Sequence, residues 1–208
     1  SYICPWGQTL PFVLREMNSL RGRLDLVYCP TVRFREGPKK VERRLWDYLA
    51  GRPGGGEPPS RKRHREAVSS AYEAQRLFEE AVRKAGLEAL GTIERSGEHS
   101  VVIVGRPYNI FDRGMNLDIP SKLREYYGVN VLPLPFLPLA SEGIEDINEN
   151  MFWAYGRKIL KAARFTAGRD RMHLVYLTNF KCGPDSYVKH FCGAAAEKGM
   201  SLKEVTDV

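Results

Sequence analysis

The second half of the chain alternates between apolar runs and amphipathic stretches. Val101-Val-Ile-Val104 is a continuous run of β-branched residues, which is typical of a strand buried on both faces. Further strands are predicted over residues 129–134, 172–177 and 202–205, and helices over residues 117–126, 152–163 and 185–198 separate them. The order βαβαβαβ from about residue 99 predicts an α/β fold with a parallel, doubly wound sheet and right-handed crossovers.

The clearest helix is predicted over residues 60–85, ahead of this α/β region. Gly86 and Gly91 are its predicted stop signals. Residues 61–65 are basic and oppose the helix dipole, so they are predicted to be a solvated end that can be neutralised without harm to the fold. Apolar residues recur every three or four positions, and the small alanines among them predict close packing on a neighbouring helix or sheet: Ala67, Ala71, Ala74, Phe78, Ala81 and Ala85.

Residues 1–50 mix apolar runs with turns. A helix is predicted around Leu10 to Met17, where apolar residues have helical spacing, and a short strand over residues 24–28. Residues 51–59 are rich in Gly and Pro and predict a linker. We therefore divide the chain into residues 1–50, the linker 51–59, a connecting helix at 60–91 and an α/β domain at 98–208.

Composition narrows the class of protein. The chain of 208 residues is 43 % apolar and 11 % aromatic, which suffices for an ordinary core and excludes wholesale disorder. No apolar run approaches the roughly 20 residues that cross a bilayer, and no signal peptide precedes the chain, so we expect a cytoplasmic protein without a membrane partner. Ser1 in place of an initiator Met, and an end just after a predicted strand, suggest a piece of a longer protein.

The net charge of +7 raises the question of nucleic-acid binding. Five Lys and Arg side chains lie between Gly51 and Arg65 against Glu57 alone, so more than half of the excess is in one Gly- and Pro-rich stretch. A surface that binds phosphates would be distributed over a folded face. A basic scaffold for nucleic acid is therefore the weakest of three hypotheses.

The four cysteines, Cys4, Cys29, Cys182 and Cys192, form no CxxC pair. Cys182 follows the third strand of the α/β domain on a tight loop before a helix, and Cys4 has a similar setting near the start of the chain. A helix N-terminus stabilises a thiolate or an anionic cluster. Spacing alone leaves open whether the two thiols are ligands or inert. Cys192 and Cys29 are predicted to be buried in the core.

Polar residues follow the first strand of the sheet, at Gly105 to Asn109. Ligands of doubly wound sheets bind beyond the carboxyl ends of the strands, so the loops of Arg106 and Cys182 are predicted to emerge at one edge. Arg106 is a candidate clamp for a phosphate or carboxylate, or the partner in a structural ion pair. Tyr108 and Asn109 are candidates for orienting a ligand or for closing the turn. No hydrolase triad, P-loop or GxGxxG motif is present.

Five motifs in this order closely resemble those of the 2-hydroxyacyl-CoA dehydratase subunits and their activators. The resemblance covers nearly all of the chain apart from the linker. The motifs are Cys4-Pro-Trp-Gly-Gln-Thr-Leu-Pro11, Val104-Gly-Arg-Pro-Tyr-Asn-Ile-Phe111, Asn116-Leu-Asp-Ile-Pro120, Phe152-Trp-Ala-Tyr155 and Leu177-Thr-Asn-Phe-Lys-Cys-Gly-Pro-Asp-Ser186.

The resemblance implies an iron–sulfur protein of Rossmann-like halves with a cluster in the cleft between them, residues 1–50 being an α/β portion of an incomplete first half. It implies cluster ligation by Cys4 and Cys182, and it makes Arg106, Tyr108 and Asn109 the expected lining of the adjoining cofactor cleft. A further cysteine of the family's N-terminal motif has no counterpart here. Two thiolates hold a cluster poorly, so we expect the cluster in the parent protein and not in this chain alone.

The sequence thus predicts a fragment of a dehydratase-like or reductase-like iron–sulfur enzyme, inactive by itself. Its parent would take part in ATP-driven electron transfer to a small-molecule substrate such as an acyl-CoA, with an activase-like ATPase region as partner. The alternative is a cluster-free Rossmann-like module that binds a phosphate-bearing small molecule at residues 105–109.

Overall fold

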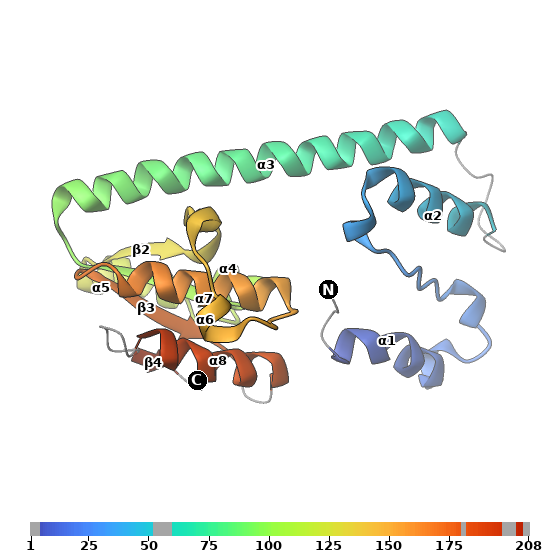
Figure 1. Ribbon diagram of the computed structural model, residues 1–208. Helices are drawn as coiled ribbons and strands as arrows, with labels where there is room; N and C mark the ends of the chain where they lie inside the picture. The colour runs from blue at the N-terminus through green and yellow to red at the C-terminus, as the bar shows by residue number, and fades with distance from the viewer. Residues whose placement is uncertain (1–4, 52–59, 180–181, 197–202, 206–208) are drawn as a thin grey trace. The chain divides into compact units, whose positions relative to one another are not determined.

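The computed structural model describes residues 5–51, 60–179, 182–196 and 203–205 (Figure 1). The chain divides into two compact units, Ser1–Glu79 and Glu80–Val208, which we call unit 1 and unit 2. Helix α3, Arg61–Ser96, begins in unit 1 and ends in unit 2. No helix among the described residues has the length and apolar content needed to span a membrane.

Unit 1 contains helices α1, Pro5–Glu16, and α2, Pro38–Ala50, besides the start of α3. Three short 3₁₀ helices join α1 to α2: η1, Asn18–Leu20, η2, Leu24–Leu26, and η3, Phe34–Glu36. The described residues of unit 1 include no strand, so the strand predicted over residues 24–28 is wrong. A strand needs a neighbour for its backbone hydrogen bonds, and here the Val27 N–H instead donates to the carbonyl oxygen of Leu24 within a turn.

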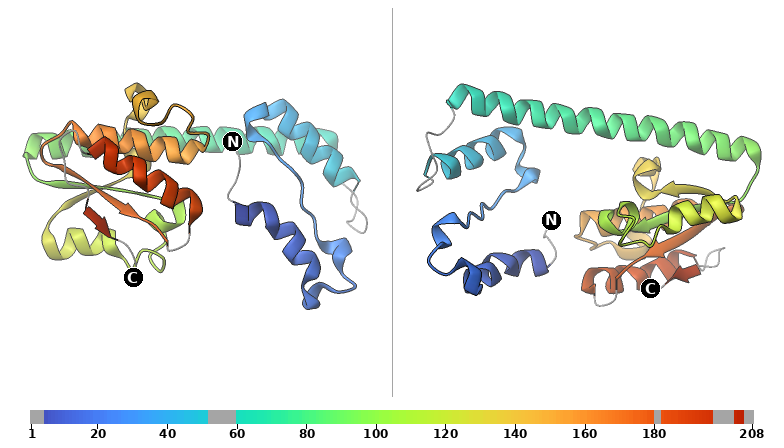
Figure 2. Two further views of the ribbon diagram at one scale, coloured as in Figure 1. Left: turned by 60° about the horizontal axis from the view of Figure 1, so that its bottom comes forward. Right: turned by 180° about the vertical axis from the view of Figure 1, so that it is seen from behind.

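Unit 2 holds a four-stranded sheet in the order β2-β1-β3-β4, with every pairing parallel. Its strands are β1, Ser100–Gly105, β2, Asn130–Pro133, β3, Met172–Leu177, and β4, Lys203–Val205. Helices α7, Ala154–Ala167, and α8, Gly183–Ala196, cover one face, and α5, Ile119–Tyr127, lies on the other (Figure 2). This arrangement confirms the predicted Rossmann-like, doubly wound α/β fold.

Shorter elements complete unit 2. Helix α4, Pro107–Phe111, follows β1 directly, and helix α6, Glu145–Asn148, precedes α7. Two 3₁₀ helices, η4, Leu134–Phe136, and η5, Leu139–Ser141, follow β2. The core lies around β1: Val102, Ile103 and Val104 are fully buried, as the continuous β-branched run predicts.

Helix α3 differs from its sequence prediction in two respects. Gly86 and Gly91 lie inside the helix and do not end it. A Cβ atom at position 86 would stand 2.0 Å from the carbonyl oxygen of Phe136, so glycine permits close packing of α3 on η4. The residues predicted to pack on a neighbouring helix or sheet are instead exposed, since no described residue covers them: Ala67, Ala71, Ala74, Phe78, Ala81 and Ala85.

Candidate functional site

The loops that follow β1 and β3 meet at one edge of the sheet in unit 2. The two strands are parallel, and their last residues, Gly105 and Leu177, are paired. Arg106 follows β1, and its Nε lies 2.7 Å from Oδ1 of Asp185 in the first turn of α8. This ion pair joins the loop of Arg106 to the segment that begins at Cys182, so the prediction that both loops emerge at the same edge is confirmed.

Asp185 is the central polar group of this edge. It is fully buried, and its second oxygen, Oδ2, accepts a hydrogen bond of 3.1 Å from the hydroxyl of Thr178. Burial by itself lowers the pKa of Arg106, but the charge and hydrogen bond of Asp185 outweigh it and raise the pKa above its ordinary value. The guanidinium is therefore charged, held through Nε, and partly exposed at 17 %.

Cys182 directly precedes α8 and is half-buried. The backbone N–H of Asp185 lies in the first turn of the helix that follows. Burial is the largest influence on the pKa of the thiol and raises it above the usual range, although the N–H of Asp185 acts in the opposite direction. The free sulfur is thus a thiol at neutral pH, and a metal ion binding there would displace its proton.

Asn109 closes the turn between the two strand ends. It is 2 % exposed, and its Nδ2 donates a hydrogen bond of 3.3 Å to the carbonyl oxygen of Leu177. The sequence left open whether Asn109 orients a ligand or closes the turn, and this hydrogen bond shows that it closes the turn. Tyr108, its neighbour in α4, is 48 % exposed. The edge of the sheet therefore brings Arg106 and Asn109 together with the loop of Cys182, and it leaves Tyr108 at the surface.

Two tyrosines that the sequence analysis did not single out stand beside Arg106. Tyr155 near the start of α7 is more than half buried, which raises its pKa to about 12, while the charge of Arg106 acts to lower it. Tyr176 of β3 is 1 % exposed, and its burial also raises its pKa. Both hydroxyl oxygens are buried and make no hydrogen bond within the described residues.

The sequence analysis also did not single out Asp185. Its signal was present in the sequence, as an acidic residue three positions after Cys182 at a predicted helix start.

The remaining cysteines take different positions. Cys4 lies outside the described residues. Cys29 is exposed, so the prediction that it is buried is wrong; the strand expected before it does not form and provides no cover. Cys192 is fully buried on α8 with Val188 and Ala195, as predicted, and burial raises its pKa to about 12.

The described residues can supply only part of a metal site. No three His, Cys, Asp or Glu side chains among them converge on a point where a metal ion could bind. Cys182 directly precedes a helix, and a helix N-terminus favours negative charge, which is a setting suited to a single thiolate ligand. Because clusters are usually held by three or four ligands, a cluster at Cys182 would require further ligands from beyond the described residues.

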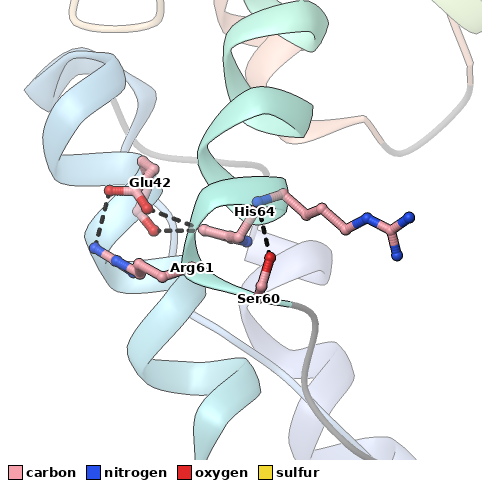
Figure 3. A network of polar contacts seen from close by, with 5 residues as sticks. Glu42, Ser60, Arg61 and His64 are labelled. Atoms are coloured by element: carbon pink, nitrogen blue, oxygen red, sulfur yellow. Dashed lines mark hydrogen bonds and ion pairs between the residues drawn. The ribbon is translucent and has the colours of Figure 1, made fainter.

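A buried polar network occupies unit 1, where the sequence predicts a solvated basic end. His64 is 6 % exposed, and its Nε2 donates a hydrogen bond of 2.9 Å to the carbonyl oxygen of Glu42 on α2. Arg61 donates to Oε2 of the same glutamate at 3.1 Å, and its guanidinium lies 4.7 Å from the ring centroid of Trp46. Figure 3 shows Arg61 and His64 both directed toward Glu42. The basic run thus attaches α3 to α2, and the predicted solvated role is wrong for these two residues.

At the opposite edge of the sheet, His99 and His173 form a pair that the sequence analysis missed. Nδ1 of His99 lies 3.0 Å from Nε2 of His173, and the ring planes are nearly parallel at 9°. One ring donates and the other accepts.

Comparison with known proteins places the chain in a family. Residues 1–137 match the model of the CoA enzyme activase uncharacterised domain (DUF2229), which is an activase-related class of protein. Since the match covers more than half of the chain, the protein belongs to this family. The matched stretch includes Arg106, Tyr108 and Asn109 and ends before Cys182. Neither a curated protein nor a solved structure gives a match.

Proposed function

We propose that the protein is part of an activase-related iron–sulfur protein that delivers low-potential electrons, with ATP hydrolysis, to a substrate that is difficult to reduce. The observation that carries this proposal is the position of Cys182, which lies at the start of α8 on the loop that meets Arg106. Membership of the CoA enzyme activase family and the resemblance to 2-hydroxyacyl-CoA dehydratases support it. Within this proposal the substrate is an acyl-CoA such as a 2-hydroxyacyl-CoA.

In this proposal Cys182 and Cys4 are ligands of the cluster. When bound, an iron–sulfur cluster supplies single electrons at a potential set by its hydrogen bonds and exposure. Asp185 contributes through two groups: its backbone N–H favours the thiolate form of Cys182, and its carboxylate holds Arg106. Two thiolates fall short of the usual ligand set, so the remaining ligands come from elsewhere in the full-length protein, and we expect the 208-residue chain alone to be inactive.

The other residues of the sheet edge bind and orient the ligand in this proposal. Arg106 presents a charged guanidinium beside Cys182, where it favours an anionic group of cluster or substrate. Asn109 ties the ends of β1 and β3 together, and Tyr108 at the surface is the third lining residue. The proposed partners are an activase-like ATPase region, in the same or another chain, and the CoA-dependent enzyme that the family description names.

The test is the iron content of the full-length natural protein prepared without oxygen. We expect iron and acid-labile sulfide in the parent, and loss of much of both in Cys182→Ala. Cys192→Ala is the matched control, because it removes the same atom at a fully buried position inside α8, ten residues after Cys182. The control should keep its iron and lose about 1 kcal/mol of stability. Full iron content in Cys182→Ala would contradict the proposal.

A second candidate function rests on the geometry of Arg106. Its ion pair with Asp185 uses Nε, and its terminal nitrogens make no hydrogen bond with the described residues. They are therefore the donors with which a cluster-free module would bind a phosphate or carboxylate. Binding of a phosphate-bearing ligand by iron-free protein, lost in Arg106→Gln, together with unchanged iron in Cys182→Ala, would favour this function over the first.

A further inference from the structure

A groove lies between α2 and α3 in unit 1, built entirely from residues of that unit. Its volume is about 550 Å³, within the range of small-molecule sites. We call it the α2–α3 groove. It is lined by the first turn of α2 and by one face of α3: Pro38, Lys39, Glu42, Arg65, Val68, Ser69, Tyr72, Glu73 and Arg76.

The charges that line the α2–α3 groove do not cancel. Both carboxylates are already engaged, because Glu42 accepts from Arg61 at 3.1 Å and Glu73 pairs with Arg76 at 2.6 Å. Lys39 and Arg65 have no carboxylate within ion-pair distance among the described residues. The groove therefore presents two uncompensated positive charges, which a ligand with at least two negative charges would match.

The lining of the groove also includes apolar residues. Val68 and Tyr72 are half-buried on α3, and Pro38 lies at the start of α2. These side chains offer hydrocarbon and ring surface to the organic part of a ligand. Inorganic phosphate would match the charge but would leave this surface uncovered, whereas an organic phosphate would use both.

Unit 1 as a whole reinforces the attraction of anions. It contains fifteen Lys and Arg against nine Asp and Glu, whereas unit 2 contains seventeen against sixteen. Lys40 and Arg43 stand next to lining residues in the sequence, and Arg63 lies two positions before Arg65; none of the three forms an ion pair with a described residue. Such an excess raises the local concentration of anionic ligands. The combination of two positive charges with apolar surface in one groove distinguishes it from a uniformly basic surface that would follow a nucleic-acid backbone.

We propose that the α2–α3 groove binds an organic phosphate of the size and charge of a nucleoside diphosphate. Lys39 and Arg65 bind its phosphate oxygens, and Tyr72 and Val68 contact its organic part. The groove shares no residue with the sheet edge of unit 2, and the proposal does not depend on the iron–sulfur assignment.

Calorimetric titration of the 208-residue chain with ADP tests the proposal. The groove variant is Lys39→Gln/Arg65→Gln. The matched control is Lys40→Gln/Arg63→Gln, which removes one lysine from α2 and one arginine from α3, and hence the same charge, outside the groove. Because charge-assisted hydrogen bonds are lost, we expect the groove variant to bind ADP about tenfold or more weakly than the parent. The control should change the affinity about twofold. Equal helix content of all three proteins, by circular dichroism, excludes unfolding as the cause.

Three further ligands separate the sources of the phosphate. Coenzyme A contains an adenosine diphosphate group, so tighter binding of coenzyme A than of ADP identifies a larger ester as the ligand. Inorganic phosphate should bind more weakly than ADP, and equal affinity would contradict the role of Tyr72 and Val68. Absence of ADP and coenzyme A binding overturns the proposal. So does equal weakening in both double variants, or preference for a single-stranded RNA oligomer, since either means that the general charge of unit 1 attracts the ligand.

Discussion

Unit 1 and unit 2 differ in the interactions that stabilise each of them internally. Unit 2 buries a continuous apolar core around β1, to which Ile159 and Leu160 of α7 and Val188 of α8 contribute. Among the described residues of unit 1, only Val41 and His64 are buried, and the contacts between α2 and α3 centre on the Glu42 network. Unit 2 therefore has the apolar burial that drives folding, whereas unit 1 depends on polar contacts, which contribute less net free energy each.

Charge follows the same division, since nearly all of the net charge belongs to unit 1. A basic unit with little core is suited to binding anionic ligands, and its stability should rise when they bind. A neutral unit with a closed core is suited to holding side chains in fixed positions at the sheet edge. The contrast indicates that unit 2 supplies the rigid site and that unit 1 supplies an adaptable, positively charged surface.

Separating the units should give the largest effect. We expect residues 80–208 alone to unfold cooperatively in urea, because they contain the whole apolar core. Residues 1–79 alone should show no cooperative transition, because two buried side chains cannot offset the entropy of ordering the chain. A cooperative transition in residues 1–79 similar to that of residues 80–208 would remove the basis of the comparison.

Within unit 2, the next largest effect is expected from Asp185→Ala. This variant leaves the Arg106 guanidinium without its partner, at a cost of about 3–5 kcal/mol in the free energy of unfolding. Asp146→Ala is the control, since its pair with Arg164 is far more exposed and contributes about 1 kcal/mol or less. Denaturant unfolding measures both. Replacing the pair together, as Asp185→Ala/Arg106→Leu, should restore part of the loss, and no restoration would contradict the account of an unpaired charge.

The packing of α3 in unit 2 is tested by two glycines of the same helix. Gly86→Ala forces a Cβ atom against the Phe136 carbonyl and should cost about 3 kcal/mol. Gly91→Ala meets only the end of the Arg95 side chain, at 3.4 Å, and should stabilise the helix by about 0.5–1 kcal/mol. Thermal unfolding should therefore shift in opposite directions for the two variants. Shifts of the same sign would show that the α3–η4 contact is not as close as described.

The smallest effect concerns the basic start of α3 in unit 1. Arg61→Ala removes the partner of Glu42 and the contact with Trp46, which should weaken unit 1 by about 1–2 kcal/mol. Arg63→Ala removes a charge of the same kind that makes no ion pair with a described residue, and it should change stability by less than about 0.5 kcal/mol. Limited proteolysis within residues 1–79 reports local opening, so cleavage should accelerate only in Arg61→Ala. Equal cleavage rates in both variants would indicate that the basic run is solvated and does not attach α3 to α2.

The elements that the sequence predicted best are those with a strong local pattern. The β-branched run of β1 and the bounds of β3, residues 172–177, match the structure, and parallel pairing then placed Arg106 and Cys182 at one edge. Contacts between distant side chains were not predictable in this way. The pairing of Arg106 with Asp185 joins residues 79 positions apart, and nothing in either local sequence names the other.

The errors have a shared physical origin, which is tertiary context overriding a local signal. Gly86 resembles a helix end, but it lies inside α3, at a position where the Phe136 carbonyl leaves no room for a side chain. His64 sits in a strongly basic run, which predicts exposure, but Glu42 draws it into a buried contact. The apolar residues 24–28 resemble a strand, but no neighbouring strand is available among the described residues of unit 1. Each case needed knowledge of a partner that the local pattern does not contain.

Gly105 has a consequence for how this protein can evolve. Its φ of +154° and its closeness to the Leu177 carbonyl, 2.2 Å from where a Cβ would stand, exclude any side chain at this position. The same carbonyl accepts the hydrogen bond of Asn109, so residues 105, 109 and 177 form one geometric constraint. A descendant that acquires a side chain at position 105 must separate the ends of β1 and β3, and with them Arg106 from Asp185. Substitution of Gly105 is therefore excluded for as long as selection preserves that edge of the sheet. The exposed Tyr108, three positions later, is under no such steric constraint.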